Sequence, residues 1–197
     1  MSDDDLVERA RQGDPAAFGE LVDRHRAAVY RAALAALGSH ADAEDAAQDT
    51  FLLAYRRLGS FRGAASFKTW LLTIAWRQAI NRRRRLVRLW RRMVEPKGCD
   101  DAGVHAAMLD GVEAAGPTPE EATVQRQLRR EVHAAIRALS PKLRDALLLA
   151  QSGNYSYEEI GAMLSAPVGT IKWRVAQARR VVRRQLHARG YDELERR

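Results

Sequence analysis

The chain has 197 residues, a formal net charge of +8 and a sequence pI near 10.2, a balance that favours a polyanionic partner. Its one cysteine, Cys99, excludes an internal disulfide framework, and no apolar run is long enough to span a bilayer. The acidic N-terminus is unlike a signal peptide, so we expect a soluble, cytoplasmic protein without membrane insertion.

The two signs of charge are sorted along the chain. Residues 77–92 contain eight arginines and no acid. Residues 32–55 contain Asp42, Glu44, Asp45 and Asp49 but neither lysine nor arginine. Because the signs occupy separate stretches, the sequence predicts more than one kind of partner.

The first half of the chain shows helical periodicity, and strand signals are almost absent. Asp14-Pro15 supplies an N-cap and a first-turn proline for a helix that ends near Gly38. We expect a second helix over residues 42–58, a loop with two glycines over 59–66, and a long helix over 67–92. The long helix begins apolar and becomes basic.

The composition changes between residues 95 and 119, where four glycines, three prolines and scattered acids leave little to bury. We expect a flexible acidic linker there. Beyond it, Pro119 opens one helix, and Ser140-Pro141 caps and starts another. The predicted fold is therefore all-α, with two small helical domains (residues 1–94 and 120–197) joined by a flexible linker (residues 95–119).

Residues 155–180 predict a helix-turn-helix. Ser156 followed by Glu159 forms a capping box, and Pro167 interrupts the helix that this box starts. The second helix has one apolar face, and these side chains lie largely outward, as suits the major groove: Lys172, Trp173, Arg174, Gln177, Arg179 and Arg180. An ordinary helical hairpin with a solvated basic face is the alternative.

Four residues of the acidic stretch, Asp45, Gln48, Asp49 and Leu52, share one outer stripe of the helix over 42–58. A solvated acidic face is the usual interpretation of such a pattern. The alternative is a docking surface for a basic partner, with apolar residues at its centre.

The loop and the long helix that follows it favour nucleic acid. Phe61 in the loop, and Trp76 on what we expect to be the solvent side of the helix, offer stacking surfaces. The donors beside them are Arg62, Arg77, Gln78, Asn81, Arg82 and Arg84. Aromatic residues along a cationic track hold single strands at about 1–3 kcal/mol per stacked base. The alternative makes Trp70 and Trp76 core residues, and for Trp70 we adopt it.

Catalysis has little support. The sequence contains no metal-binding, dinucleotide-binding, phosphate-loop or nucleophile-elbow motif. Cys99 and His105, both in the predicted linker, are too few to form a closed metal site. We expect no enzyme activity, no metal and no cofactor.

At this point the motifs resemble those of the extracytoplasmic-function sigma factors of bacterial RNA polymerase. Asp42-Ala-Glu-Asp-Ala-Ala-Gln-Asp-Thr-Phe-Leu is similar to the family's core-polymerase-binding helix, and Phe67-Lys-Thr-Trp-Leu-Leu-Thr-Ile-Ala to the start of its promoter −10 recognition helix. Ala138-Leu-Ser-Pro-Lys-Leu-Arg, Tyr157-Glu-Glu-Ile-Gly and Pro167-Val-Gly-Thr-Ile-Lys resemble its −35-binding domain. The motifs occur in the family's order over nearly the whole chain.

The resemblance implies three partners: core RNA polymerase, promoter DNA and an anti-sigma factor. It implies that the acidic stripe docks on the polymerase clamp's coiled coil, and that the loop over 61–66 captures a flipped −10 base beside Arg77 and Asn81. The −35 groove would face Lys172, Arg174 and Gln177, with Thr170, Trp173, Arg179 and Arg180 on the same helix.

Three residues depart from the family pattern. Arg77 stands where many members have asparagine, Trp173 where a small polar residue is usual, and Ala176 where some have a larger side chain. Trp173 either packs inward or reaches a thymine methyl. Two rival functions stay open: a conventional helix-turn-helix regulator that binds duplex DNA by itself, and an adaptor that binds only proteins.

Overall fold

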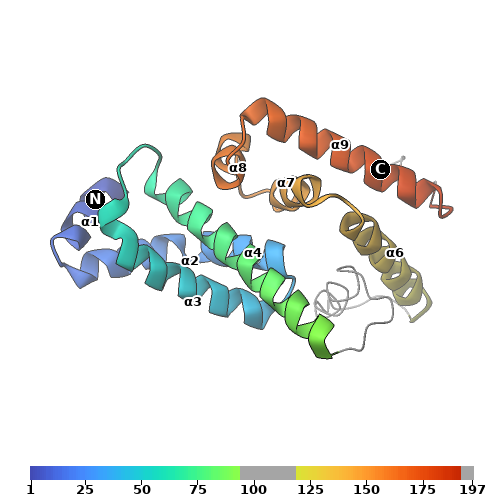
Figure 1. The fold of residues 1–197 in the computed structure, drawn as a ribbon, viewed down its shortest axis with the longest axis horizontal. Helices are drawn as coiled ribbons and strands as arrows, with labels where there is room; N and C mark the ends of the chain where they lie inside the picture. The colour runs from blue at the N-terminus through green and yellow to red at the C-terminus, as the bar shows by residue number, and fades with distance from the viewer. Residues whose placement is uncertain (94–118, 192–197) are drawn as a thin grey trace.

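The computed structural model describes residues 1–93 and 119–191. Within these ranges the chain forms helices and turns and no strand, so the all-α prediction is confirmed. The first unit contains α1 (Asp3–Arg11), α2 (Pro15–Leu37), α3 (His40–Arg57), the short 3-10 helix η1 (Leu58–Ser60) and α4 (Phe67–Met93). The second contains α6 (Pro119–Arg137), α7 (Pro141–Gln151), α8 (Tyr157–Leu164) and α9 (Val168–His187) (Figure 1).

Local capping signals set several of the helix ends. The Asp14 carboxylate accepts hydrogen bonds from the backbone of Ala16 and Ala17 at the start of α2, and Gly38 ends that helix with φ 71°. These boundaries match the predictions. The helix predicted over 42–58 begins slightly earlier, because the Ser39 hydroxyl caps α3. Ser140 stands at the start of α7 as predicted, but its side chain makes no capping hydrogen bond.

Helix α1 was not predicted from the sequence. Ser2 and Asp5 form a capping box, and Leu6, Val7 and Ala10 are buried on one face of the helix. From its last turn, Arg11 donates hydrogen bonds to the carbonyl oxygens of Leu58 and Phe61. The helix therefore supports the loop that leads into α4.

In the first unit α2, α3 and α4 pack against one another in pairs, and α1 packs on α2 (Figure 1). The faces that meet are rich in alanine, with Ala32, Ala33, Ala43, Ala54 and Ala75 fully buried. Small side chains let these helices approach closely, which leaves the charged residues on the outer faces.

In the second unit α7 and α8 pack on α9, and α6 also contacts α9. The predicted helix-turn-helix is present: the capping box of Ser156 and Glu159 starts α8, and Ser165, with φ 51°, ends it. The Ala166 backbone donates to the Gly161 carbonyl at 2.9 Å across this turn.

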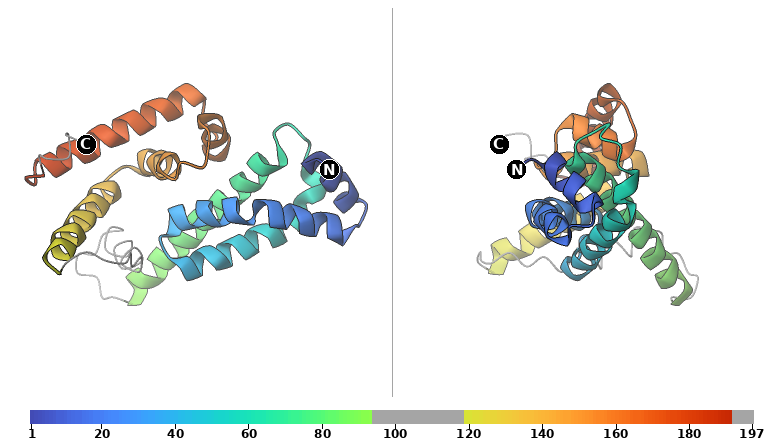
Figure 2. Two further views of the ribbon diagram at one scale, coloured as in Figure 1. Left: turned by 180° about the vertical axis from the view of Figure 1, so that it is seen from behind. Right: turned by 90° about the vertical axis from the view of Figure 1, so that its left-hand side faces the viewer.

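The two units are in contact, with α8 against α4 and α7 against α2 (Figure 2). Residues of both belong to one buried cluster, which includes Leu72 of α4 and Ile160 of α8. The predicted linker, with Cys99 and His105, lies outside the described residues except for Pro119, the first residue of α6. No helix in the described ranges has the length and hydropathy needed to cross a bilayer.

Candidate nucleic-acid interface

The second helix of the helix-turn-helix, α9, is held by Ile171, Val175 and Ala178, which are buried. This register turns its other faces to solvent. Exposed there are Lys172, Trp173, Arg179 and Arg180, while Thr170, Arg174 and Gln177 are half-buried along the flanks. Trp173 is 62% exposed, so it does not pack inward, and its contact with a thymine methyl stays a prediction.

The turn before α9 fixes where this face lies. A Cβ atom built on Gly161 would lie 2.8 Å from the Ala166 carbonyl oxygen, so only glycine permits the observed approach of the turn to α8. The Lys172 ammonium lies over the Tyr157 ring, 5.9 Å from its centroid, which restrains the side chain at the start of the exposed row.

On the first unit, Arg62, Arg77, Asn81 and Arg84 are exposed and Gln78 is half-buried. These residues belong to the predicted polar track on the loop and α4, and their contact with DNA stays a prediction. The Arg77 guanidinium also contacts the hydroxyl of Ser165, 3.5 Å away in the second unit.

The predicted exposure of Phe61 and Trp76 is wrong. Phe61 is 6% exposed because its ring packs edge-on against Phe67 at 5.9 Å and lies 5.3 Å from Trp70. Trp76 is 3% exposed and belongs to the central core. Trp70 packs against that core, as expected. Neither Phe61 nor Trp76 presents a free ring face for stacking in this arrangement.

Arg82, a predicted DNA contact on α4, forms ion pairs with carboxylates of α3. Its guanidinium contacts Asp42 at 2.9 Å and Asp45 at 2.7 Å. Although partial burial acts to lower it, these two carboxylates raise the pKa of Arg82 above its ordinary value. A predicted DNA contact is therefore paired with a residue of the acidic stripe.

The acidic stripe itself lies on the outer face of α3. Asp45, Gln48 and Asp49 are exposed, and Leu52 is 59% exposed, which is high for a leucine. Tyr55, one turn further on, is also exposed and packs edge-on against Phe18 at 4.9 Å. Tyr55 was not among the predicted site residues, although its spacing from Leu52 places both on one face.

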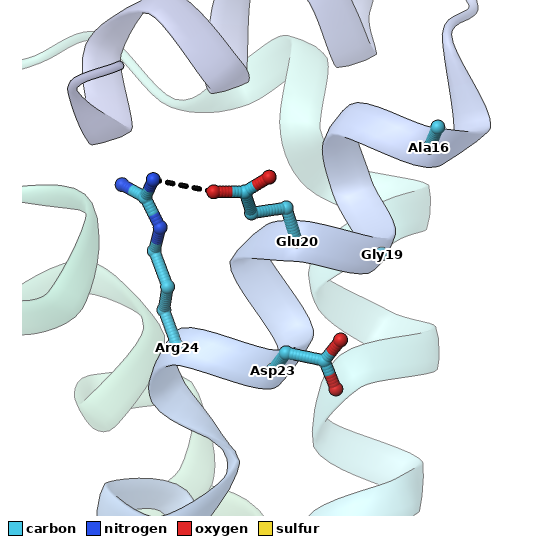
Figure 3. Close-up of a pocket in the computed structure, with 5 residues that line it drawn as sticks. All are labelled: Ala16, Gly19, Glu20, Asp23 and Arg24. Atoms are coloured by element: carbon cyan, nitrogen blue, oxygen red, sulfur yellow. Dashed lines mark hydrogen bonds and ion pairs between the residues drawn. The ribbon is translucent and has the colours of Figure 1, made fainter.

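A hollow on the surface of α2 is lined by Ala16, Gly19, Glu20, Asp23 and Arg24, all from that one helix (Figure 3). Arg24, its one cation, already pairs with Glu20, as Figure 3 shows. The hollow therefore offers no free cation to a ligand. In the parts of the chain that the structure describes, no group of histidine, cysteine and acidic residues is arranged to hold a metal.

The fold and the surfaces define a two-unit helical protein with a helix-turn-helix, a basic track and a separate acidic and apolar face. Two family models match, sigma-70 region 2 over residues 21–89 and sigma-70 region 4 over residues 129–182. The chain belongs to the sigma-70 family, in its extracytoplasmic-function group, because relatives over nearly its full length carry that designation.

Three relatives illustrate the match. The RNA polymerase sigma-H factor of Pseudomonas aeruginosa is 35% identical over 93% of both chains. The ECF sigma factor SigW of Bacillus subtilis is 32% identical over 91% of this chain and 94% of its own length. The ECF sigma-E factor of Escherichia coli is 36% identical over 92% of this chain and 93% of its own.

Two solved structures share the fold. CnrH, solved in complex with the cytosolic domain of CnrY, superposes with a TM-score of 0.59 at 23% identity and covers 93% of this chain and 96% of its own. The sigma factor RpoE of Bartonella quintana, solved with the anti-sigma factor NepR, gives 0.57 at 24% identity, covering 86% of this chain and 96% of its own.

Proposed function

We propose that this chain is an RNA polymerase sigma factor, a non-enzymatic subunit that binds core polymerase in the cytoplasm and directs it to promoters. One observation carries the proposal: an acidic and apolar face on α3 and a cationic row on α9 are both exposed, on the two units that match sigma regions 2 and 4. A protein partner fits the first face and DNA fits the second.

The α3 face is the polymerase-docking surface in this proposal. Asp49 and Gln48 supply polar contacts around Leu52, whose exposure supplies an apolar centre. A basic helical partner would bury Leu52 and meet the carboxylates at the rim, which is the usual anatomy of a protein interface.

The α4 track is the −10 surface. Arg62, Arg77 and Arg84 supply charge for the phosphate backbone, and Asn81 supplies an amide for a base edge. Because Phe61 and Trp76 are buried, capture of an unstacked base by this surface depends on hydrogen bonds rather than on those two rings.

The α9 row is the −35 surface. Lys172, Arg174 and Gln177 lie in its first turns, the part of a recognition helix that contacts base edges. Arg179 and Arg180 follow further along and suit phosphates. The exposed indole of Trp173 adds an apolar surface for a thymine methyl.

Control by an anti-sigma factor is part of the proposal. The RpoE structure that shares this fold was solved with an anti-sigma factor. The faces proposed for polymerase and DNA are exposed in the free chain, so a protein that covers either of them would prevent transcription.

Transcription in vitro tests the proposal. The purified chain is added to core polymerase from the source bacterium, with fragmented genomic DNA as template, and transcript starts are mapped. We expect discrete starts that share sequence elements near −10 and −35. Asp49→Lys on α3 should abolish them, whereas Asp23→Lys, the same charge change on an exposed residue of α2, should not.

Other outcomes would support the rival functions. If the isolated chain binds a specific duplex tightly without polymerase and yields no transcripts, the chain is a conventional helix-turn-helix regulator. If it binds polymerase but never crosslinks to DNA, it is an adaptor.

A further inference from the structure

Arg82 of α4 bridges two carboxylates of α3. Its Nε donates to Asp42 Oδ1 at 2.9 Å, and its Nη2 donates to Asp45 Oδ2 at 2.7 Å. The two acids stand three positions apart on α3, so they lie on one side of that helix. A guanidinium carries its donors in a fixed planar fork, which suits two acceptors at a fixed separation. One arginine therefore holds both carboxylates in place.

The basic stripe of α4 follows a different side of that helix. Four exposed residues recur at intervals of three or four positions, the spacing of one helical face: Arg77, Asn81, Arg84 and Arg88. Arg82 follows Asn81 by one position, which turns it about 100° around the helix axis. The Arg82 side chain is only 24% exposed, because it lies against α3. Arg82 thus lies off the stripe that the proposed function assigns to DNA.

The two carboxylates differ in how much of each is open to a partner. The Asp42 side chain is 22% exposed, whereas the Asp45 side chain is 60% exposed. Asp45 belongs to the acidic stripe on α3, so Arg82 holds one oxygen of a residue whose outer side faces solvent. The contact fixes where the Asp45 carboxylate lies without covering it.

Arg82 also offsets the crowding of negative charge on α3. The first half of that helix carries four acids: Asp42, Glu44, Asp45 and Asp49. Like charges three or four positions apart on a helix repel each other. Without the bridging cation, the Asp45 side chain would spread over several rotamers, and a partner would have to order it on binding.

We propose that Arg82 is a positioning residue of the polymerase-docking surface and not a DNA contact: it holds the Asp45 carboxylate in the orientation that a basic partner meets. The inference rests on the proposed function, which assigns the α3 face to core polymerase. Net charge alone predicts the opposite effect. Removal of Arg82 makes the α3 face more negative, which would strengthen its attraction for a basic partner, whereas loss of positioning weakens docking.

The affinity of the full chain for core polymerase, measured by fluorescence anisotropy with a dye on Cys99, tests this sign. We expect Arg82→Gln to bind about fivefold more weakly than the parent chain, which corresponds to about 1 kcal/mol, the cost of ordering one side chain. Arg26→Gln removes the same charge from an exposed residue of α2 and should leave the affinity unchanged.

The conservative variant Arg82→Lys keeps the charge but loses the planar fork that bridges both acids, so we expect a smaller loss of affinity. A circular dichroism melt confirms that each variant is folded. If Arg82→Gln does not fold, Arg82→Lys provides the comparison with Arg26→Gln. An affinity equal to or higher than that of the parent chain, in whichever variant folds, would overturn the proposal.

A double-mutant cycle separates positioning from a general loss of structure. If Arg82 acts through Asp45, Arg82→Gln should not lower polymerase affinity further in a chain that already carries Asp45→Ala. A defect in the fold would lower the affinity by the same factor in both backgrounds. Equal losses would therefore overturn the positioning role.

The salt dependence of DNA binding tests whether Arg82 contacts phosphate. Core polymerase saturated with each variant is titrated with a labelled single strand of mixed sequence at several salt concentrations. Loss of one phosphate contact lowers the slope of log affinity against log salt by about 0.7. We expect this change for Arg84→Gln on the exposed stripe and none for Arg82→Gln. The same change in both variants would assign Arg82 to DNA and overturn the proposal.

Failure of this role and failure of the proposed function give different results. If the parent chain binds core polymerase and directs transcription, but Arg82→Gln behaves like Arg26→Gln, only the role of Arg82 is overturned. If the parent chain does not bind core polymerase, the proposed function is overturned and the role of Arg82 with it.

Discussion

Gly161→Ala tests the geometry of the helix-turn-helix by adding a single methyl group. The added methyl would lie 2.8 Å from the Ala166 carbonyl oxygen, closer than real Cβ atoms approach such an atom. That oxygen is backbone, so it cannot rotate away as a flexible side chain would. Relief requires the turn between α8 and α9 to move, and with it the orientation of the exposed row on α9.

The loss of stability expected for Gly161→Ala can be estimated from the steric clash that the added methyl makes. Overpacking by one methyl in a well-packed site costs about 1–3 kcal/mol. For a chain of this size each kcal/mol lowers the melting temperature by about 2–4 °C, so we expect a fall of roughly 2–12 °C. Replacing a helical glycine otherwise favours folding by about 0.5–1 kcal/mol, which offsets part of the cost.

Gly19→Ala is the matched control. Gly19 lies within α2, is exposed, and has no atom within 4 Å of an added Cβ. That variant should therefore be slightly more stable than the parent chain. Urea unfolding followed by circular dichroism measures both variants. If Gly161→Ala is as stable as Gly19→Ala, the turn is not held by close backbone approach and the steric explanation is wrong.

Three further outcomes follow from the structure. Ser156→Ala should cost about 1 kcal/mol by removing the capping box of α8, whereas Ser140→Ala should cost nothing measurable by urea unfolding, since that hydroxyl caps nothing. Burial raises the pKa of Asp145 above 3.8 despite the attraction of Arg83, so the folded chain binds this proton more tightly than the unfolded one. The free energy of unfolding should therefore fall as the pH rises from 3.8 through the raised pKa of Asp145. Urea unfolding at a series of pH values measures this fall, and Asp145→Asn should remove it. Replacing thymine by uracil at one position of a −35 duplex should weaken binding about fourfold, because a methyl contact of about 0.8 kcal/mol is lost. Binding by the Trp173→Ala variant should not change with this replacement. If both proteins lose affinity equally, the indole does not touch a methyl.

The sequence was sufficient where structure depends on neighbours in the chain. The caps of α2 and α8 and the outward face of α9 follow from residues three or four positions apart, and all were predicted. The Ser2 and Asp5 capping box was as local as these, so α1 was predictable in principle and was overlooked.

The errors concern residues whose surroundings come from distant parts of the chain. Phe61 looked exposed because it stands in a glycine-flanked loop, yet it packs on Phe67 and Trp70. Helical periodicity did not indicate that Trp76 is buried. The Arg83 pair with Asp145 joins positions 62 residues apart, and no local pattern indicates such a contact.

The guanidinium of Arg11 ties the first helix to the carbonyl oxygens of Leu58 and Phe61, although that helix precedes the segment matched by the region 2 model. A fragment trimmed to the matched segment would leave both oxygens without this donor and remove a support of the loop between η1 and α4. It would also lack the start of α2 and should bind the −10 strand poorly, so fragments of this chain need to include α1.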